Sequence, residues 1–302
     1  LKVQQVAEEM GVRYVLEGSV QTSGEQIRVT VQLIDAVKGY HLWSERYDRR
    51  MEHLFAVQDE ITQQIVVALQ VTLTEGEQAR VRHRTTRNLQ AWGYAAQGYT
   101  LFERFSPKDN ARARQLFERA VEIDPDYVWA WAMLGWTHFV DARLAYVADR
   151  AAAIKRSFGI AQKALAMDDK LPDAQALLAG NYWVLRQYDK ALAAGRKAIA
   201  LDPNSAEIHA ILAQIVHDLG RWDEAIAMGK TAVRLHPRYP SWYLLAMSRA
   251  LVFKGEYDLA TEAAEEGLRR AESDVLKSGF HFNLAFAHIE AGREAEARRH
   301  MA

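Results

Sequence analysis

Apolar side chains in the first eighty residues change their spacing twice, which indicates two kinds of secondary structure. They recur at helical spacing before Gly11, at Val3, Val6, Ala7 and Met10. They then alternate with polar residues in three segments separated by short turns, residues 12–22, 27–33 and 41–47. Helical spacing returns at Val57, Ile61, Ile65, Val66, Leu69 and Leu73. The pattern predicts a three-stranded antiparallel meander that an amphipathic helix covers on one face.

This predicted region has a thin core, because a small sheet generally needs more strands or a full helical cover. We therefore expect at least one further strand and one helix before Leu1, which is not a methionine, and we predict that the sequence is part of a longer chain. A basic run follows the region, at Arg80, Arg82, Arg84 and Arg87. Such a run is usually a solvated linker. The predicted boundaries are 1–80 for the first domain, 81–88 for the linker and 89–302 for the rest.

From residue 89 onward the pattern repeats with a period of 34 residues. Tripeptides of the Leu-Asp-Pro type recur at matching places, in residues 123–125, 167–169 (without proline), 201–203 and 235–237. The interval is 34 residues from Asp169 to Pro203, and again from Pro203 to Pro237. Small residues recur where a larger side chain would force two helices apart, at Ala191, Ala225 and Ala260. The period predicts helix–turn–helix units that stack into a superhelix.

Several units depart from the regular period. The first carries roughly three extra residues at 104–110. The second has an insertion around 141–150, and the fifth is one residue long, since Gly220 and Gly255 are 35 positions apart. A further unit starts near Ser278 and is cut off in its second helix. The sequence thus predicts five units and a truncated sixth.

The 34-residue unit resembles the tetratricopeptide repeat, and the first region resembles the TolB amino-terminal-like α/β domain. The segments that carry the second resemblance are Gly11–Val20, Gln32–Asp35, Leu42–Asp48 and Phe55–Thr62. In bacteria this domain often precedes tetratricopeptide repeats, notably in the carboxy-terminal half of class III adenylate/guanylate cyclases. The resemblance implies a small α+β domain followed by an all-α tetratricopeptide-repeat superhelix, with a cyclase catalytic domain upstream of Leu1. None of that domain's metal-binding aspartates can be assigned to positions in this sequence.

Composition narrows the function classes. The 302 residues include 38 Lys and Arg against 39 Asp and Glu, so no global field draws the chain to nucleic acid or to an anionic membrane. The absence of cysteine excludes disulfides, thiolate metal sites and a cysteine nucleophile. The longest mostly apolar stretch, Tyr127–Val140, is too short and too interrupted to span a bilayer. We expect no nucleic-acid partner and no membrane segment within this sequence.

The sequence contains no convincing catalytic motif. Gly229-Lys230-Thr231 looks like the end of a phosphate-binding loop, but such a loop needs glycine at position 224, where Glu224 stands. No two histidines have the i,i+4 spacing of a zinc site. The pairs that could share a helix face are His209 with His217 and His281 with His288. We predict no catalytic, cofactor-binding or metal-binding residue, and no enzyme activity for this segment.

The resemblance to tetratricopeptide repeats implies a groove lined by positions 2, 5, 9, 12 and 13 of each unit. Eight of these positions are the candidate partner-binding residues: Trp129, Trp136, Phe139, Trp183, Gln214, His217, Leu244 and Ser248. The other expected groove positions are Val140, Asp173, Val184, Glu207, Asp218, Ser241 and Leu251. In the alternative interpretation the tryptophans pack between repeats or cover residues 141–150, as aromatic stripes at helical spacing usually do.

The ligand that this groove implies is an apolar or mixed protein segment. The Lys/Asn/Arg set that clamps a terminal carboxylate in chaperone-binding repeats is absent, so an acidic tail is not expected. The sequence therefore predicts a non-catalytic scaffold that binds a protein, its own upstream domain or another copy. The alternatives are the regulatory tail of a larger class III nucleotide cyclase, expected in the cytoplasm, and an envelope-associated role, because TolB-like domains also occur in periplasmic proteins. The oligomeric state and any ligand of the α/β domain are left open.

Overall fold

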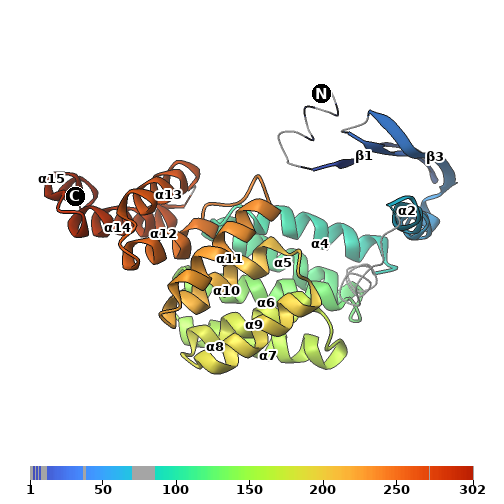
Figure 1. Ribbon diagram of the computed structural model, residues 1–302. Helices are drawn as coiled ribbons and strands as arrows, with labels where there is room; N and C mark the ends of the chain where they lie inside the picture. The colour runs from blue at the N-terminus through green and yellow to red at the C-terminus, as the bar shows by residue number, and fades with distance from the viewer. Residues whose placement is uncertain are drawn as a thin grey trace. The chain divides into compact units, whose positions relative to one another are not determined.

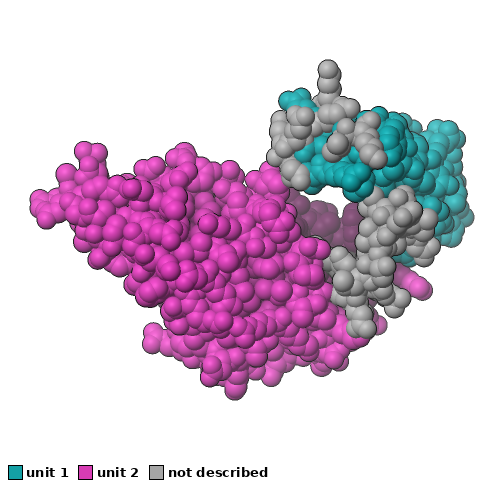
Figure 2. Space-filling model, in the orientation of Figure 1, with its two compact units in different colours: residues 1–74 teal, residues 75–302 magenta. Residues whose placement is uncertain are grey.

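The computed structural model describes residues 12–36, 39–69, 86–271 and 273–301, together with the single positions 3, 5 and 7. The chain forms two compact units, residues 1–74 and 75–302 (Figure 2). Most of the predicted opening helix, the end of the predicted covering helix at Leu73, and Arg80, Arg82 and Arg84 lie outside the described residues.

The first unit is a three-stranded antiparallel meander, as the alternating pattern predicts. Its strands β1 (Tyr14–Ser23), β2 (Gln26–Asp35) and β3 (Tyr40–Arg50) pair in the order β1-β2-β3. A short 3-10 helix, η1 (Met51–His53), leads into α2 (Leu54–Leu69). Because β2 is central, its apolar side chains meet both β3 and the helix.

The core of this unit lies between α2 and the two strands β2 and β3. Its buried members are Ile27, Val29, Val31, Tyr47 and Val57. The apolar side chains of β1 remain exposed, namely Tyr14, Leu16 and Val20. The helix therefore covers only part of the sheet face that the alternating pattern marks as apolar.

The second unit consists of helices that pack in consecutive antiparallel pairs (Figure 1). The pairs are α4 (Leu89–Phe102) with α5 (Pro107–Ile123), α6 (Val128–Arg143) with α7 (Arg150–Met167), α8 (Pro172–Val184) with α9 (Tyr188–Leu201), α10 (Ala206–Asp218) with α11 (Trp222–Leu235), α12 (Tyr243–Phe253) with α13 (Tyr257–Arg270), and α14 (Asp274–Glu290) with α15 (Glu294–Met301). Each pair is one predicted repeat, and each first helix also packs on the first helix of the next pair. The predicted fold class, a small α+β region followed by an all-α superhelix, is confirmed.

The small residues of the repeat lie where helices approach most closely. Ala191, Ala225 and Ala260 are completely buried, which is the packing that the sequence predicts. Gly220 and Gly255 have φ values of 73° and 77° just after α10 and α12, so they end these helices in the left-handed region that glycine adopts without strain. Within the described residues no helix is long and apolar enough to cross a membrane.

Candidate functional site

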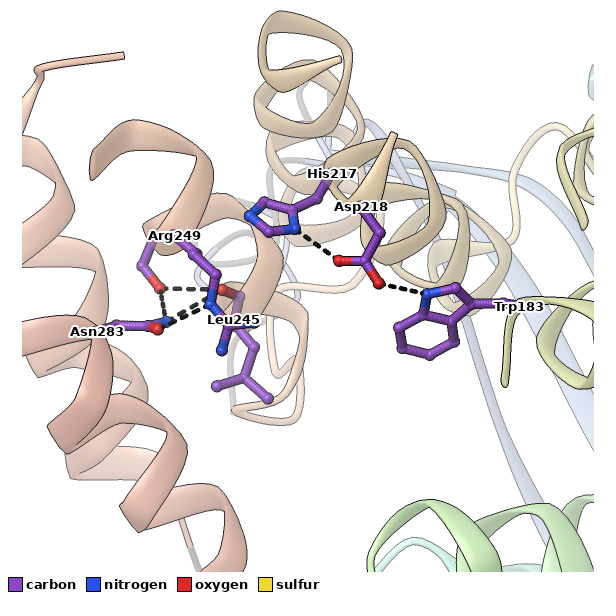
Figure 3. Close-up of polar contacts among 7 residues, drawn as sticks. Trp183, His217, Asp218, Leu245, Arg249 and Asn283 are labelled. Atoms are coloured by element: carbon purple, nitrogen blue, oxygen red, sulfur yellow. Dashed lines mark hydrogen bonds and ion pairs between the residues drawn. The ribbon is translucent and has the colours of Figure 1, made fainter. Parts of the chain in front are cut away.

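One residue from each of five consecutive first helices forms a row that we call the inner stripe: Arg143, Trp183, Asp218, Arg249 and Phe282. The Arg143 guanidinium carbon lies 4.8 Å from the centre of the Trp183 ring, at the distance of a cation–π contact. Trp183 donates from Nε1 to Oδ2 of Asp218 over 2.7 Å (Figure 3). The guanidinium carbon of Arg249 lies 5.7 Å from the Phe282 ring centre.

The charged groups of the inner stripe influence one another. Loss of solvation lowers the pKa of Arg143 and of Arg249, and attraction to Asp218 offsets part of this effect. Burial alone would raise the pKa of Asp218, but hydrogen bonds from His217 and Trp183, with the nearby Arg249 charge, lower it overall. Arg143 is exposed and Arg249 half-buried, so solvent reaches both side chains.

Asn283 fixes the position of Arg249 on this surface. The Arg249 Nε donates to Oδ1 of Asn283 over 3.1 Å. Nδ2 of Asn283 donates in turn to the Leu245 carbonyl over 3.2 Å and to the Ser248 hydroxyl over 2.8 Å (Figure 3). Because Asn283 is fully buried, this network holds the guanidinium in one place and joins α12 to α14.

His217 presents an unsatisfied polar atom beside the stripe. Its Nδ1 lies 2.9 Å from Oδ1 of Asp218, so the carboxylate favours the tautomer that carries its proton on Nδ1. Nε2 is buried and has no hydrogen-bond partner. A buried acceptor of this kind costs roughly 1–3 kcal/mol when it is left unpaired.

Aromatic side chains form an apolar cluster next to Phe282, the stripe residue on α14. The rings of Phe282 and Phe286 are 6.2 Å apart between centres, and those of Phe286 and Phe253 are 5.5 Å apart. Phe253 also stacks on Trp222, with ring centres 5.0 Å apart. Phe253 and Phe282 are exposed. The surface can thus receive apolar side chains next to charged groups.

The candidate residues from the sequence divide between this surface and the interior. Trp183 belongs to it, and His217 is buried beside it. Gln214 faces the neighbouring helix, where its Nε2 lies 3.5 Å from the Trp242 carbonyl oxygen. Trp136 and Phe139 pack edge to face within α6, with ring centres 5.1 Å apart. Trp129 is buried among the aromatic rings of Tyr99, Phe117 and Tyr127. Trp129 therefore follows the alternative interpretation, in which aromatic residues pack between repeats.

Leu244 and Ser248 lie in the interior rather than on the inner surface, with exposed fractions of 3% and 0%. The extra residue of the fifth repeat lies in the loop before α12, so every position in that helix moves forward by one. Arg249 consequently takes the place that the sequence-based register gives to Ser248. Counting backward from Gly255, instead of forward from Pro237, would have found this register.

Arg143 and Phe282 are further members that the sequence analysis did not identify. Arg143 lies beyond the usual groove positions, because α6 continues to that residue instead of ending where the repeat pattern places its turn. Phe282 belongs to the sixth repeat, to which the expected groove positions were not extended. The insertion around 141–150 is the feature of the sequence that indicates Arg143, since extra residues can lengthen the helix before them.

Other chemistry weighed from the sequence finds no support in the structure. Gly229, Lys230 and Thr231 lie within α11, and a Cβ on Gly229 would come within 2.9 Å of Met247, so no phosphate-cradling loop exists there. Among the described residues no group of three or more histidine or acidic side chains could hold a metal ion.

The stacked helix pairs define the fold class: the helical unit has the fold of a tetratricopeptide-repeat array. Residues 152–231 match the family model described as "Anaphase-promoting complex, cyclosome, subunit 3". A thermophilic TPR protein from Thermus thermophilus, TTC0263, is similar in structure with a TM-score of 0.51 and 20% identity, over 64% of this chain and 98% of that one. Pseudomonas aeruginosa pilF is similar with a TM-score of 0.49 and 17% identity, over 70% of this chain and 89% of that one.

One curated protein is similar in sequence. It is "Putative adenylate cyclase 3" of Rhizobium meliloti (strain 1021), 37% identical over 192 residues, which are 63% of this chain. The match covers 32% of the relative, so the chain spans about a third of the length of the curated protein that it matches.

Proposed function

We propose that the repeat array is a scaffold that binds an extended protein segment along the inner stripe, and that this segment carries a carboxylate among apolar side chains. The observation that carries the proposal is the geometry of the stripe: the Arg143 guanidinium lies over the Trp183 ring, Asn283 holds the Arg249 guanidinium, and Asp218 is the one acidic residue among the five. A ligand carboxylate would bind the guanidinium groups through charge-assisted hydrogen bonds. This is a mixed segment, which agrees with the character expected from the sequence.

The neighbouring groups suit the rest of such a segment. Apolar side chains of the ligand would pack on Trp183 and on the aromatic cluster that includes Phe282 and Phe253. Aromatic and arginine side chains together are the residues most often responsible for binding energy at protein interfaces.

We further propose that the parent protein is a nucleotide cyclase and that this chain is its regulatory region. The relative named as an adenylate cyclase supports this interpretation, and so does the order of an α+β unit followed by repeats. On this proposal residues 1–80 form a TolB amino-terminal-like domain, 81–88 a linker and 89–302 the repeats. The region would lie in the cytoplasm, where the ATP substrate of a cyclase is found.

The binding proposal is tested with a fluorescent peptide of alternating leucine and glutamate, compared with leucine–glutamine and leucine–lysine peptides. Fluorescence anisotropy should give the leucine–glutamate peptide the highest affinity. Arg249→Met should weaken it by about 10- to 100-fold, because a hydrogen bond to a charged group is lost. Arg234→Met is the matched control, since Arg234 is an exposed residue of the outer helix α11.

Equal affinity for the three peptides, or an Arg249→Met variant that binds as tightly as the control while keeping the same circular dichroism, would show that the inner stripe is not the binding surface. The regulatory-region proposal has a separate test: because this chain would not hold the catalytic site, the purified 302 residues should form no cAMP from ATP. Measurable cAMP formation would contradict both the scaffold and the regulatory-region proposals.

A further inference from the structure

The first repeat touches the fifth, although repeats of a solenoid ordinarily contact only their neighbours. Phe105 lies in the loop between α4 and α5, and its ring centre is 6.3 Å from that of Trp242, which immediately precedes α12. Phe105 also packs against the hydrophobic cluster that includes Leu244 and Phe280. The array therefore bends far enough for its first pair of helices to reach its fifth.

A hydrogen bond ties the loop between α6 and α7 to the same point. Tyr146, in that loop, donates its hydroxyl proton to the Phe105 carbonyl. We call the three residues Phe105, Tyr146 and Trp242 the clasp.

Each of the three clasp residues comes from a different departure from the regular repeat. The extra residues at 104–110 contain Phe105, the insertion at 141–150 contains Tyr146, and the lengthened fifth repeat places Trp242 before α12. Phe105 has a φ of 47°, which is a left-handed conformation that costs a non-glycine residue roughly 1–2 kcal/mol. Such a conformation persists where surrounding contacts hold it. Irregularities that are far apart in the sequence thus meet at one point.

We propose that the clasp closes the array across its inner face and controls the access of a segment to the inner stripe; this role in access rests on the binding function proposed above. A closed array admits an extended segment only from its ends, whereas an opened array admits it from the side. The clasp is a small contact of a few side chains between repeats that are not neighbours. It can therefore open without unfolding any helix pair.

The existence of the clasp is tested by energy transfer in the full chain. The sequence has no cysteine, so Lys108→Cys and Arg238→Cys, at two exposed positions near the two sides of the clasp, accept a donor and an acceptor dye specifically. Tyr146→Phe removes one hydroxyl and should shift the ratio of open to closed molecules by about fivefold, the effect of one hydrogen bond. Phe105→Ala should shift the population further toward low transfer, and X-ray scattering should show a larger radius of gyration.

Tyr188→Phe, in α9, is the matched control and should leave the transfer efficiency unchanged. Tyr146→Phe keeps the aromatic ring, so it still tests the clasp if the Phe105→Ala variant fails to fold. If both clasp variants keep the transfer efficiency and radius of gyration of the unmodified chain, the clasp does not hold the array closed.

The role in access is measured by the association rate of the leucine–glutamate peptide in stopped flow. This rate should rise about fivefold in Tyr146→Phe, in step with the open population. An unchanged rate together with a changed transfer efficiency would overturn the role in access. The peptide could also fail to bind every variant while the transfer efficiency changes. That result would support the clasp as a contact that closes the array, but it would contradict both the binding function and the role in access that rests on it.

Discussion

Burial shifts the pKa of individual side chains in the array, and His138 is the clearest case. It lies in α6 with 9% of its surface exposed. Burial, together with the charge of Arg114, lowers its pKa from 6.5 to about 4 against the opposing effect of Asp141. At neutral pH the folded chain therefore holds this imidazole without charge.

This pKa predicts a loss of stability in mild acid. The unfolded chain binds a proton at His138 near pH 6.5, whereas the folded chain does so only near pH 4. The stabilisation from neutral His138 is thus complete above pH 6.5 and is lost as the pH falls toward 4, by up to about 3 kcal/mol. Urea unfolding between about pH 7 and pH 4 should show this loss relative to His138→Gln.

The exposed His41 provides the control, because His41→Gln should follow the pH dependence of the unmodified chain. A His138→Gln variant whose stability falls with pH as steeply as that of the unmodified chain would contradict this account.

At the scale of the helices, close approach of one helix to the next depends on glycine at a few positions. A Cβ built on Gly267 of α13 would lie 2.2 Å from the Phe280 ring, which is fully buried in α14. A Cβ on Gly159 of α7 would meet nothing within 4 Å. The same substitution therefore has opposite consequences at these two helical positions.

Gly267→Ala should destabilise the array by roughly 1–3 kcal/mol, since an overpacked ring has no free space into which to move. Gly159→Ala should instead stabilise it by about 0.5–1 kcal/mol, because alanine loses less backbone entropy in an exposed helix. Chemical denaturation of both variants measures the difference. Equal effects of the two substitutions would show that the packing of α13 on α14 is looser than described.

The sequence predicts the helices correctly where the spacing of residues within one repeat is enough to place them. The 34-residue period gives the helix pairs from α8 to α11, because small residues and turn residues recur at fixed offsets. It misplaces the surface of α12 by one residue, because counting forward from Pro237 crosses the loop that holds the extra residue. Leu244 and Ser248 are therefore in the interior, and Arg249 lies on the surface.

For the whole molecule, the hydrophobic clusters of the described residues each lie within one unit. The clusters of the helices draw on residues from Ala91 onward, and that of the sheet on residues up to Ile61. An array whose core is supplied by its own repeats has what it needs to fold alone.

A fragment of residues 86–302 should therefore keep the helical circular dichroism of the array and unfold within a few degrees of the helical transition of the full chain. Thermal unfolding followed at a helical wavelength measures this, with residues 1–74 as the companion fragment. A fragment of residues 86–302 that is unfolded, or that melts without cooperativity, would mean that the array depends on the preceding unit.

The sequence by itself determined the meander, the repeat period and the positions of small residues between helices, because each depends on spacing within one or two elements. It also placed Trp183 among the expected groove residues. Only the tertiary structure decided that Trp183 contacts both Arg143 and Asp218, that Trp129 is interior, and that Phe105 meets Trp242. These contacts join separate repeats, and they depend on where extra residues are absorbed and on how far the superhelix bends.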